Sequence, residues 1–178
     1  MGFASEVISA ILIHRHQPNA LPTNIYVFAE AILITFFLKK LGLFDKRPKM
    51  FYLICGLFAA VWIAENFVFS TIHVFGSYFR ILYSFIIVLM SIHQINKLIH
   101  ATKKTLLRDP NFLILTGFII FFTYKVLIEI FYVYGFDGKD SFSMQVYRLM
   151  TYINLLVNLI FATALLWIPK KHASILLY

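Results

Sequence analysis

Two ionisable residues four positions apart interrupt a long apolar segment of the chain. The stretch FFTYKVLIEIF, residues 121–131, holds Lys125 and Glu129 in a run that is otherwise free of charge. An ionisable side chain within hydrocarbon costs about 3 kcal/mol, so such residues usually face the interior of a helix bundle and find partners there. Because residues four apart share one face of a helix, the spacing predicts that Lys125 and Glu129 pair with each other inside a bundle.

The acidic residues divide by type between loops and apolar segments. All four aspartates lie in loops, whereas all four glutamates, Glu6, Glu30, Glu65 and Glu129, lie in apolar segments. At about 1.5 Å of rise per residue, these glutamates and Lys125 lie roughly 8 to 13 Å below the same end of their helices. They are therefore expected to form one polar belt in the outer half of a membrane. Since burial and like charges disfavour the ionised form, some carboxyls are expected to be protonated or to hold a cation.

Two asparagines are expected near the centre of the last apolar segment. Asn154 and Asn158, in TYINLLVNLIF, are four apart and share one helix face. Interhelical hydrogen bonding is the first expectation for such residues, and lining a polar pocket is the second. The same alternative holds for the glutamates, since a polar side chain in a span can act only as a link between helices.

The elements that must position these residues are membrane-spanning helices. The chain has 178 residues, of which 61% are hydrophobic and 13% are charged, a composition far from that of a soluble domain. Five segments are long enough to cross the hydrocarbon core, which takes about 17 to 25 apolar residues. They lie near 21–38, 50–72, 79–96, 112–134 and 144–168, and residues 1–13 are expected to form a half-length helix. We therefore predict an all-α integral membrane bundle with a single domain over residues 1–178.

The basic residues predict the orientation of this bundle. Eleven of them lie in the 39–50 loop, the 97–110 loop and the C-terminal tail, which share one side if there are five spans. The opposite side is assigned four: Arg15, Arg80, Lys139 and Arg148. By the positive-inside rule, the C-terminus is expected to face the cytoplasm. The net charge of +8 is then a topology signal and an attraction to anionic lipid, and no nucleic-acid partner is expected.

The remaining residues that could do chemistry form no recognisable catalytic or cofactor motif. Cys55 is the single cysteine, and the spans contain no aspartate, nucleophile elbow, metalloprotease motif or nucleotide-binding loop. We therefore expect no enzyme activity, no cofactor and no metal. His14, His16 and His73 are expected together on the outer side, where solvated loop histidines are the first expectation and a pH-sensing cluster the second.

The order of residues over much of the chain carries a resemblance. His16 is followed after nine residues by Tyr26, Glu30 lies four residues later, and the last span closes with INLLVNLIFATALLWIPKK. In this layout the chain resembles small multi-span bacterial membrane proteins of uncharacterised function. The resemblance implies a multi-pass protein of the bacterial cytoplasmic membrane and supplies no mechanism. Such proteins carry one more full helix at the N-terminus, where this chain has a half-length segment.

Three functions remain open at the level of the sequence. The leading hypothesis is a sensory or accessory subunit with an outward-facing polar pocket, whose basic cytoplasmic loops meet a protein partner. The second is transport, by a proton- or cation-coupled carrier subunit or by a pore formed from several copies, as in bacterial defence effectors. The third is a structural scaffold, in which the polar residues only link helices.

Overall fold

The computed structural model describes residues 19–101, 106–133 and 141–167. Over these ranges the chain is helical, with no strand, and its elements are listed here in chain order. They are α2 (Ala20–Lys40), α3 (Pro48–Ile63), the π-helix η1 (Ala64–Phe69), α4 (Ser77–Ala101), the short 3-10 helix η2 (Leu106–Arg108), α5 (Pro110–Val133) and α6 (Ser141–Leu166). Within the described ranges, five segments are helical, long and apolar enough to cross a membrane, and their bounds lie within a few residues of the five predicted segments. The half-length helix expected over residues 1–13 lies outside the described residues.

Local sequence signals set several helix boundaries. Asp109 caps α5, since its Oδ1 accepts hydrogen bonds from the backbone N–H groups of Asn111 at 2.8 Å and Phe112 at 3.3 Å. Pro110 follows at the first helical position, where proline is favoured because its missing N–H would have no intrahelical partner. Helix α2 ends with two lysines that complement its dipole, and Gly42 then adopts a φ of +82° in the turn that follows.

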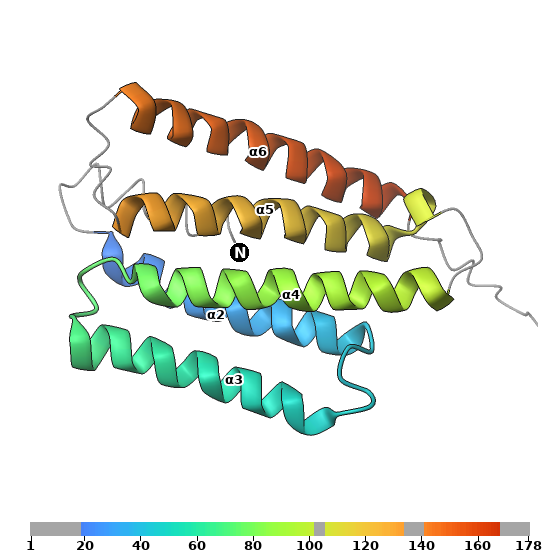
Figure 1. The fold of residues 1–178 in the computed structure, drawn as a ribbon, viewed down its shortest axis with the longest axis horizontal. Coiled ribbons are helices and arrows are strands. Elements are labelled where there is room, and N and C mark those ends of the chain that lie inside the picture. Colours follow the sequence, from blue (N-terminus) through green and yellow to red (C-terminus); the bar gives the residue numbers. More distant parts are fainter. Residues whose placement is uncertain (1–18, 102–105, 134–140, 168–178) are drawn as a thin grey trace, which may run out of the picture.

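Helix α4 lies at the centre of the bundle. It packs against α5 along its length and also contacts α2 and α3, whereas α6 packs on the far side of α5 at the edge of the bundle (Figure 1). The buried core between α2, α3, α4 and α5 is strongly aromatic, with Phe58, Phe79, Tyr83 and Phe122 all at most 2% exposed. Many large apolar side chains point outward instead, as is expected of helices whose outer faces meet lipid.

Two connections define the ends of the bundle. The 41–47 connection joins α2 to α3 at one end, where α4 finishes, and the 70–76 connection leads into α4 at the other. At the 41–47 end, α4 holds the end of α2: Gln94 Nε2 donates to the Leu41 carbonyl and Lys97 Nζ to the Gly42 carbonyl, each at 2.6 Å. These bonds satisfy carbonyls that a helix C-terminus leaves without an intrahelical donor.

Close packing of α5 against α6 depends on a glycine. A Cβ atom built on Gly117 would lie 2.5 Å from a ring carbon of Phe161, so a larger residue there would displace the Phe161 ring at the contact between α5 and α6. In contrast, the exposed Gly56 on α3 has no other atom within 4 Å of such a Cβ among the described residues. Of these two glycines, only Gly117 therefore lies at a tight contact between helices.

Candidate functional site

The polar residues of the bundle gather toward the 70–76 end, and a π-helix helps to place two of them. In η1 the wider turn places the consecutive residues Glu65 and Asn66 both inside, at 8% and 3% exposure. Glu65 caps α4: its Oε1 accepts from the backbone N–H of Tyr78 at 2.9 Å and its Oε2 from that of Phe79 at 2.6 Å. A carboxylate at this position complements the positive end of the helix dipole, so Glu65 needs no cation as a partner.

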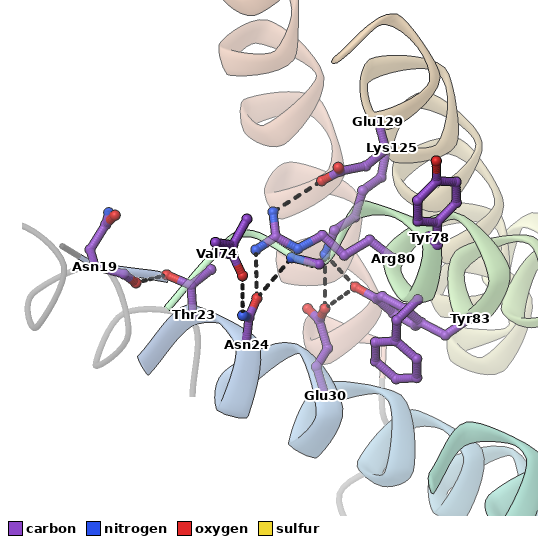
Figure 2. Close-up of polar contacts among 12 residues, drawn as sticks. Asn19, Thr23, Asn24, Glu30, Val74, Tyr78, Arg80, Tyr83, Lys125 and Glu129 are labelled. Carbon is purple, nitrogen blue, oxygen red and sulfur yellow. Dashed lines mark hydrogen bonds and ion pairs between the residues drawn. The ribbon is translucent and has the colours of Figure 1, made fainter. Parts of the chain in front are cut away.

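Among the described residues, the first of two largely buried ion pairs joins α2 to α5. Lys125 Nζ lies 2.9 Å from Glu30 Oε2, and both side chains are only 14% exposed. Glu30 also accepts hydrogen bonds from the hydroxyls of Tyr83, at 2.7 Å, and Tyr26, at 3.0 Å. Lys125 in turn contacts the Tyr83 hydroxyl. We call these four residues the Lys125 cluster. The ion pair and the hydrogen bonds to the Glu30 carboxylate link α2, α4 and α5, and Figure 2 shows Glu30, Tyr83 and Lys125.

The second ion pair joins α4 to α5 nearer the 70–76 end. Arg80 Nη1 lies 3.1 Å from Glu129 Oε1, and the side chains are 12% and 10% exposed. Arg80 Nη2 also donates to Asn24 Oδ1 at 3.5 Å, so the guanidinium lies between α5 and α2, as Figure 2 shows. Asn24 is fixed by further bonds, since its amide donates to the Val74 carbonyl at 2.7 Å and to Asn66 Oδ1 at 3.0 Å. We call Arg80, Glu129 and Asn24 the Arg80 cluster.

The predicted pairing of Lys125 with Glu129 is wrong. Both residues do face the interior from α5, but Lys125 pairs with Glu30 of α2 and Glu129 with Arg80 of α4. A lysine placed four residues before a glutamate is the weaker orientation for a pair within one helix, and cations and carboxylates on neighbouring helices lie within direct reach here. The two buried charges of α5 therefore bind the helix to two different neighbours.

A small pocket opens beside the Arg80 cluster. Its volume is about 210 Å³, and its walls come from the 70–76 connection, the first turn of α4 and the last turns of α5. The lining residues are Phe75, Ser77, Arg80, Ile128, Glu129 and Tyr132. Two polar atoms of the lining residues, Ser77 Oγ and Arg80 Nε, are buried and have no hydrogen-bond partner in the part of the chain that the structure describes. Since buried polar atoms are usually paired, these two hold hydrogen-bonding capacity that the described residues leave unused.

Buried polar groups continue along α4 below the ion pairs. Ser84 and Ser91 are fully buried, and Gln94 is 7% exposed. Within the described ranges, neither Ser91 Oγ nor Gln94 Oε1 has a hydrogen-bond partner, although the Gln94 amide nitrogen binds the end of α2. Together with Ser77 the serines recur every seven residues, which keeps them on the face of α4 that is buried. Polar groups thus occur on the inside of α4 from one end of the bundle to the other.

The structure brings together part of the predicted site. We call the Lys125 cluster, the Arg80 cluster and Glu65 together the polar layer. Of the seven residues expected in the polar pocket, Glu30, Glu65, Lys125 and Glu129 lie in this layer. Asn154 and Asn158 do not, because α6 lies at the edge of the bundle; Asn154 is half-buried and Asn158 is exposed. Glu6 lies outside the described residues.

Of the three histidines that were expected to lie together, His73 is the one within the described residues. His73 is exposed in the 70–76 connection, while His14 and His16 lie outside the described ranges. Among the described residues, no group of three or more His, Cys, Asp or Glu side chains could hold a metal ion.

Several members of the polar layer were missed in the sequence. Arg80 was counted with the outer loops, but it lies in the first turn of α4 and its side chain is only 12% exposed. Its position next to the start of the predicted 79–96 span was the available signal. Asn24, Tyr26 and Tyr83 were missed as well. The spacing of four between Tyr26 and Glu30 was an available signal, whereas Asn24 and Tyr83 bind residues of other elements, which the sequence does not indicate.

Comparison of the chain with models of known protein families, with curated proteins and with solved structures finds no match.

Proposed function

We propose that this is a multi-pass membrane protein of the bacterial cytoplasmic membrane that acts as a sensory or accessory subunit, without a catalytic centre. The eleven basic residues assigned to one side support an orientation in which the 41–47 end and the C-terminus face the cytoplasm. The pocket beside the Arg80 cluster then opens outward. The observation that carries the proposal is that two residues lining this pocket, Ser77 and Arg80, each hold a buried polar atom with no hydrogen-bond partner among the described residues, next to the Arg80–Glu129 ion pair.

The chemistry of the pocket favours a small organic anion. Arg80 Nε and the Ser77 hydroxyl can both donate to a carboxylate, and Phe75, whose ring centre lies 5.2 Å from the guanidinium carbon, offers an apolar wall. An anion bound to Arg80 would compete with Glu129 for the same cation. Because Glu129 and Lys125 lie on one face of α5, a weaker Arg80–Glu129 pair would favour a displacement of α5 relative to α2 and α4. A ligand that binds one arrangement better than the other shifts the population between them.

Ligand-dependent thermal stability of the purified protein tests this function. A panel of small carboxylates and their uncharged amides is screened against the wild type, Arg80→Gln and the control Arg148→Gln. Arg148 is exposed on α6 and is not among the residues that line the pocket. At 100 times the dissociation constant, a ligand should stabilise the wild type and the control by about 2.7 kcal/mol.

The Arg80→Gln variant should show none of this stabilisation. Ser77→Val, which keeps the ion pair intact, should weaken it. The proposal fails if no carboxylate stabilises the wild type, or if Arg80→Gln responds as the wild type does.

A second function, proton-coupled transport, is favoured by a different observation. The buried polar groups of α4 continue past the two ion pairs to Ser91 and Gln94, near the 41–47 end. Chains of ionisable and hydroxyl groups within a membrane are typical of proton relays.

Proton flux into liposomes that contain the purified protein tests this second function. The wild type is compared with Ser91→Ala and with Thr163→Ala, whose hydroxyl is exposed on α6 and donates to the Leu159 carbonyl. Transport requires a flux that falls in Ser91→Ala and persists in Thr163→Ala; a folded wild type without flux rules it out.

A further inference from the structure

A larger groove lies at the opposite end of the bundle from the polar pocket. Its volume is about 580 Å³, and it is bounded by the 41–47 connection, the first turns of α3 and the last turns of α4. This volume lies within the range of about 300 to 1,000 Å³ that small-molecule sites usually have. The polar layer does not use any residue that lines it. The groove is therefore separate from the candidate site described above.

The rim of the groove is basic. Lys46 and Arg47 come from the 41–47 connection, and His93 and Lys97 come from α4, one turn apart. Lys46, Arg47 and His93 are exposed, so their side chains are free to meet a ligand at the surface. Lys97 is held in place by its bond to the Gly42 carbonyl, which positions its ammonium before any ligand arrives. Among the described residues that line the groove, none is acidic.

Both walls of the groove also carry apolar residues. On α3, Met50 and Ile54 follow the basic residues toward the middle of the bundle. On α4, Leu89 and Met90 lie one turn deeper than His93. Leu89 is 51% exposed and Met50 40%, so the apolar part opens to the surroundings of the bundle rather than closing into a cavity. A ligand that fills the whole groove must therefore be anionic at one end and apolar at the other.

We propose that this groove is a binding site for one anionic phospholipid. The phosphate would lie among Lys46, Arg47 and Lys97, and an acyl chain would lie along Leu89 and Ile54, between α3 and α4. Basic residues at the cytoplasmic ends of membrane helices attract anionic headgroups, by about 1 kcal/mol per Lys or Arg. A soluble partner protein would cover the rim but would leave the apolar part unfilled. The site requires that the helices lie in a bilayer, and it does not depend on what the polar pocket binds.

Lipid retention measured by native mass spectrometry tests the site. The full chain is purified from vesicles of equal parts dioleoyl phosphatidylglycerol and dioleoyl phosphatidylcholine, and the bound lipids are counted and titrated. The test variant is Lys46→Gln with Arg47→Gln, and the matched control is Lys40→Gln with Lys49→Gln. The control removes two charges at the same end of the bundle from residues that do not line the groove.

The wild type and the control should each retain one phosphatidylglycerol and release phosphatidylcholine. At about fivefold in affinity per charge, the test variant should bind phosphatidylglycerol roughly 25-fold more weakly. Leu89→Trp, which obstructs the apolar part from an exposed position without changing the charge, should also lose the lipid. Equal losses in the test variant and the control would overturn the proposal in favour of general attraction between charges. Displacement of the lipid by millimolar inorganic phosphate would overturn it in favour of a site for a free anion.

Discussion

Replacing Lys125 with methionine removes the cation that lies 2.9 Å from Glu30 in the interior of the bundle. At this distance and an effective dielectric constant of about 20, the attraction between two unit charges is on the order of 6 kcal/mol before desolvation. Breaking a buried pair by removing one partner typically costs about 3–5 kcal/mol. We expect Lys125→Met to fall near 3 kcal/mol, because Glu30 can take up a proton and retains its contacts with Tyr26 and Tyr83.

Two double-mutant cycles distinguish the pairing in the structure from the one that the sequence spacing suggests. One cycle combines Lys125→Met with Glu30→Gln, and the other combines Lys125→Met with Glu129→Gln. The first pair should show a coupling energy of about 2–3 kcal/mol, in the range for residues in direct contact. The second should show less than about 0.5 kcal/mol, since Glu129 has Arg80 as its partner.

Equilibrium unfolding in mixed detergent micelles, followed by tryptophan fluorescence, gives the four free energies that each cycle needs. A coupling between Lys125 and Glu129 as large as that between Lys125 and Glu30 would refute the assignment of partners. It would mean that the two charges of α5 form a local pair and that α2 is held by other contacts.

Further predictions concern single positions, and each is measured by the same unfolding assay. Glu65→Ala leaves one buried and one partly buried amide at the start of α4 without their acceptor and should cost about 1–3 kcal/mol. Gly42→Ala should cost about 1–2 kcal/mol, because its φ of +82° disfavours a side chain and the added Cβ would lie 2.7 Å from Asp45 Oδ2. Gly117→Ala should cost about 1–3 kcal/mol, because the added methyl overlaps the ring of Phe161. Gly56→Ala is the matched control: it meets open space in a helix and should be neutral or stabilising by up to about 1 kcal/mol.

The predicted spans agree with the structure because they depend on local composition. A helix that crosses a bilayer must satisfy its backbone hydrogen bonds internally, so a run of about twenty apolar residues is sufficient to define it. The boundaries follow from equally local signals, such as Asp109 before Pro110 at the start of α5. The sequence also predicted that Glu30, Glu65, Lys125 and Glu129 face the interior of the bundle. This prediction needs only the residue type at each position, because an ionisable side chain is costly in hydrocarbon and usually faces the bundle interior.

Which charges pair was decided only by the tertiary structure. The sequence spacing of Lys125 and Glu129 describes one helix, whereas the distances that set electrostatic energy depend on how α2, α4 and α5 pack. Arg80 looked like a loop residue because it lies so near the start of its helix, and only the packing of α5 over the first turn of α4 buries it. Asn158 was expected to contact another helix or to line the pocket, but it is exposed because α6 lies at the edge of the bundle.

The pocket beside Arg80 and the groove beside Lys97 depend both on the residue types in the sequence and on the packing of the helices. The basic residues of the 41–47 end and the carboxyls of the helices are visible as residue types, and their side of the membrane follows as an expectation from charge counting alone. The pocket beside Arg80 and the groove beside Lys97 each draw their walls from more than one helix or connection. The shape of a cavity depends on how neighbouring elements pack, and the order of residues along each helix does not by itself determine that packing.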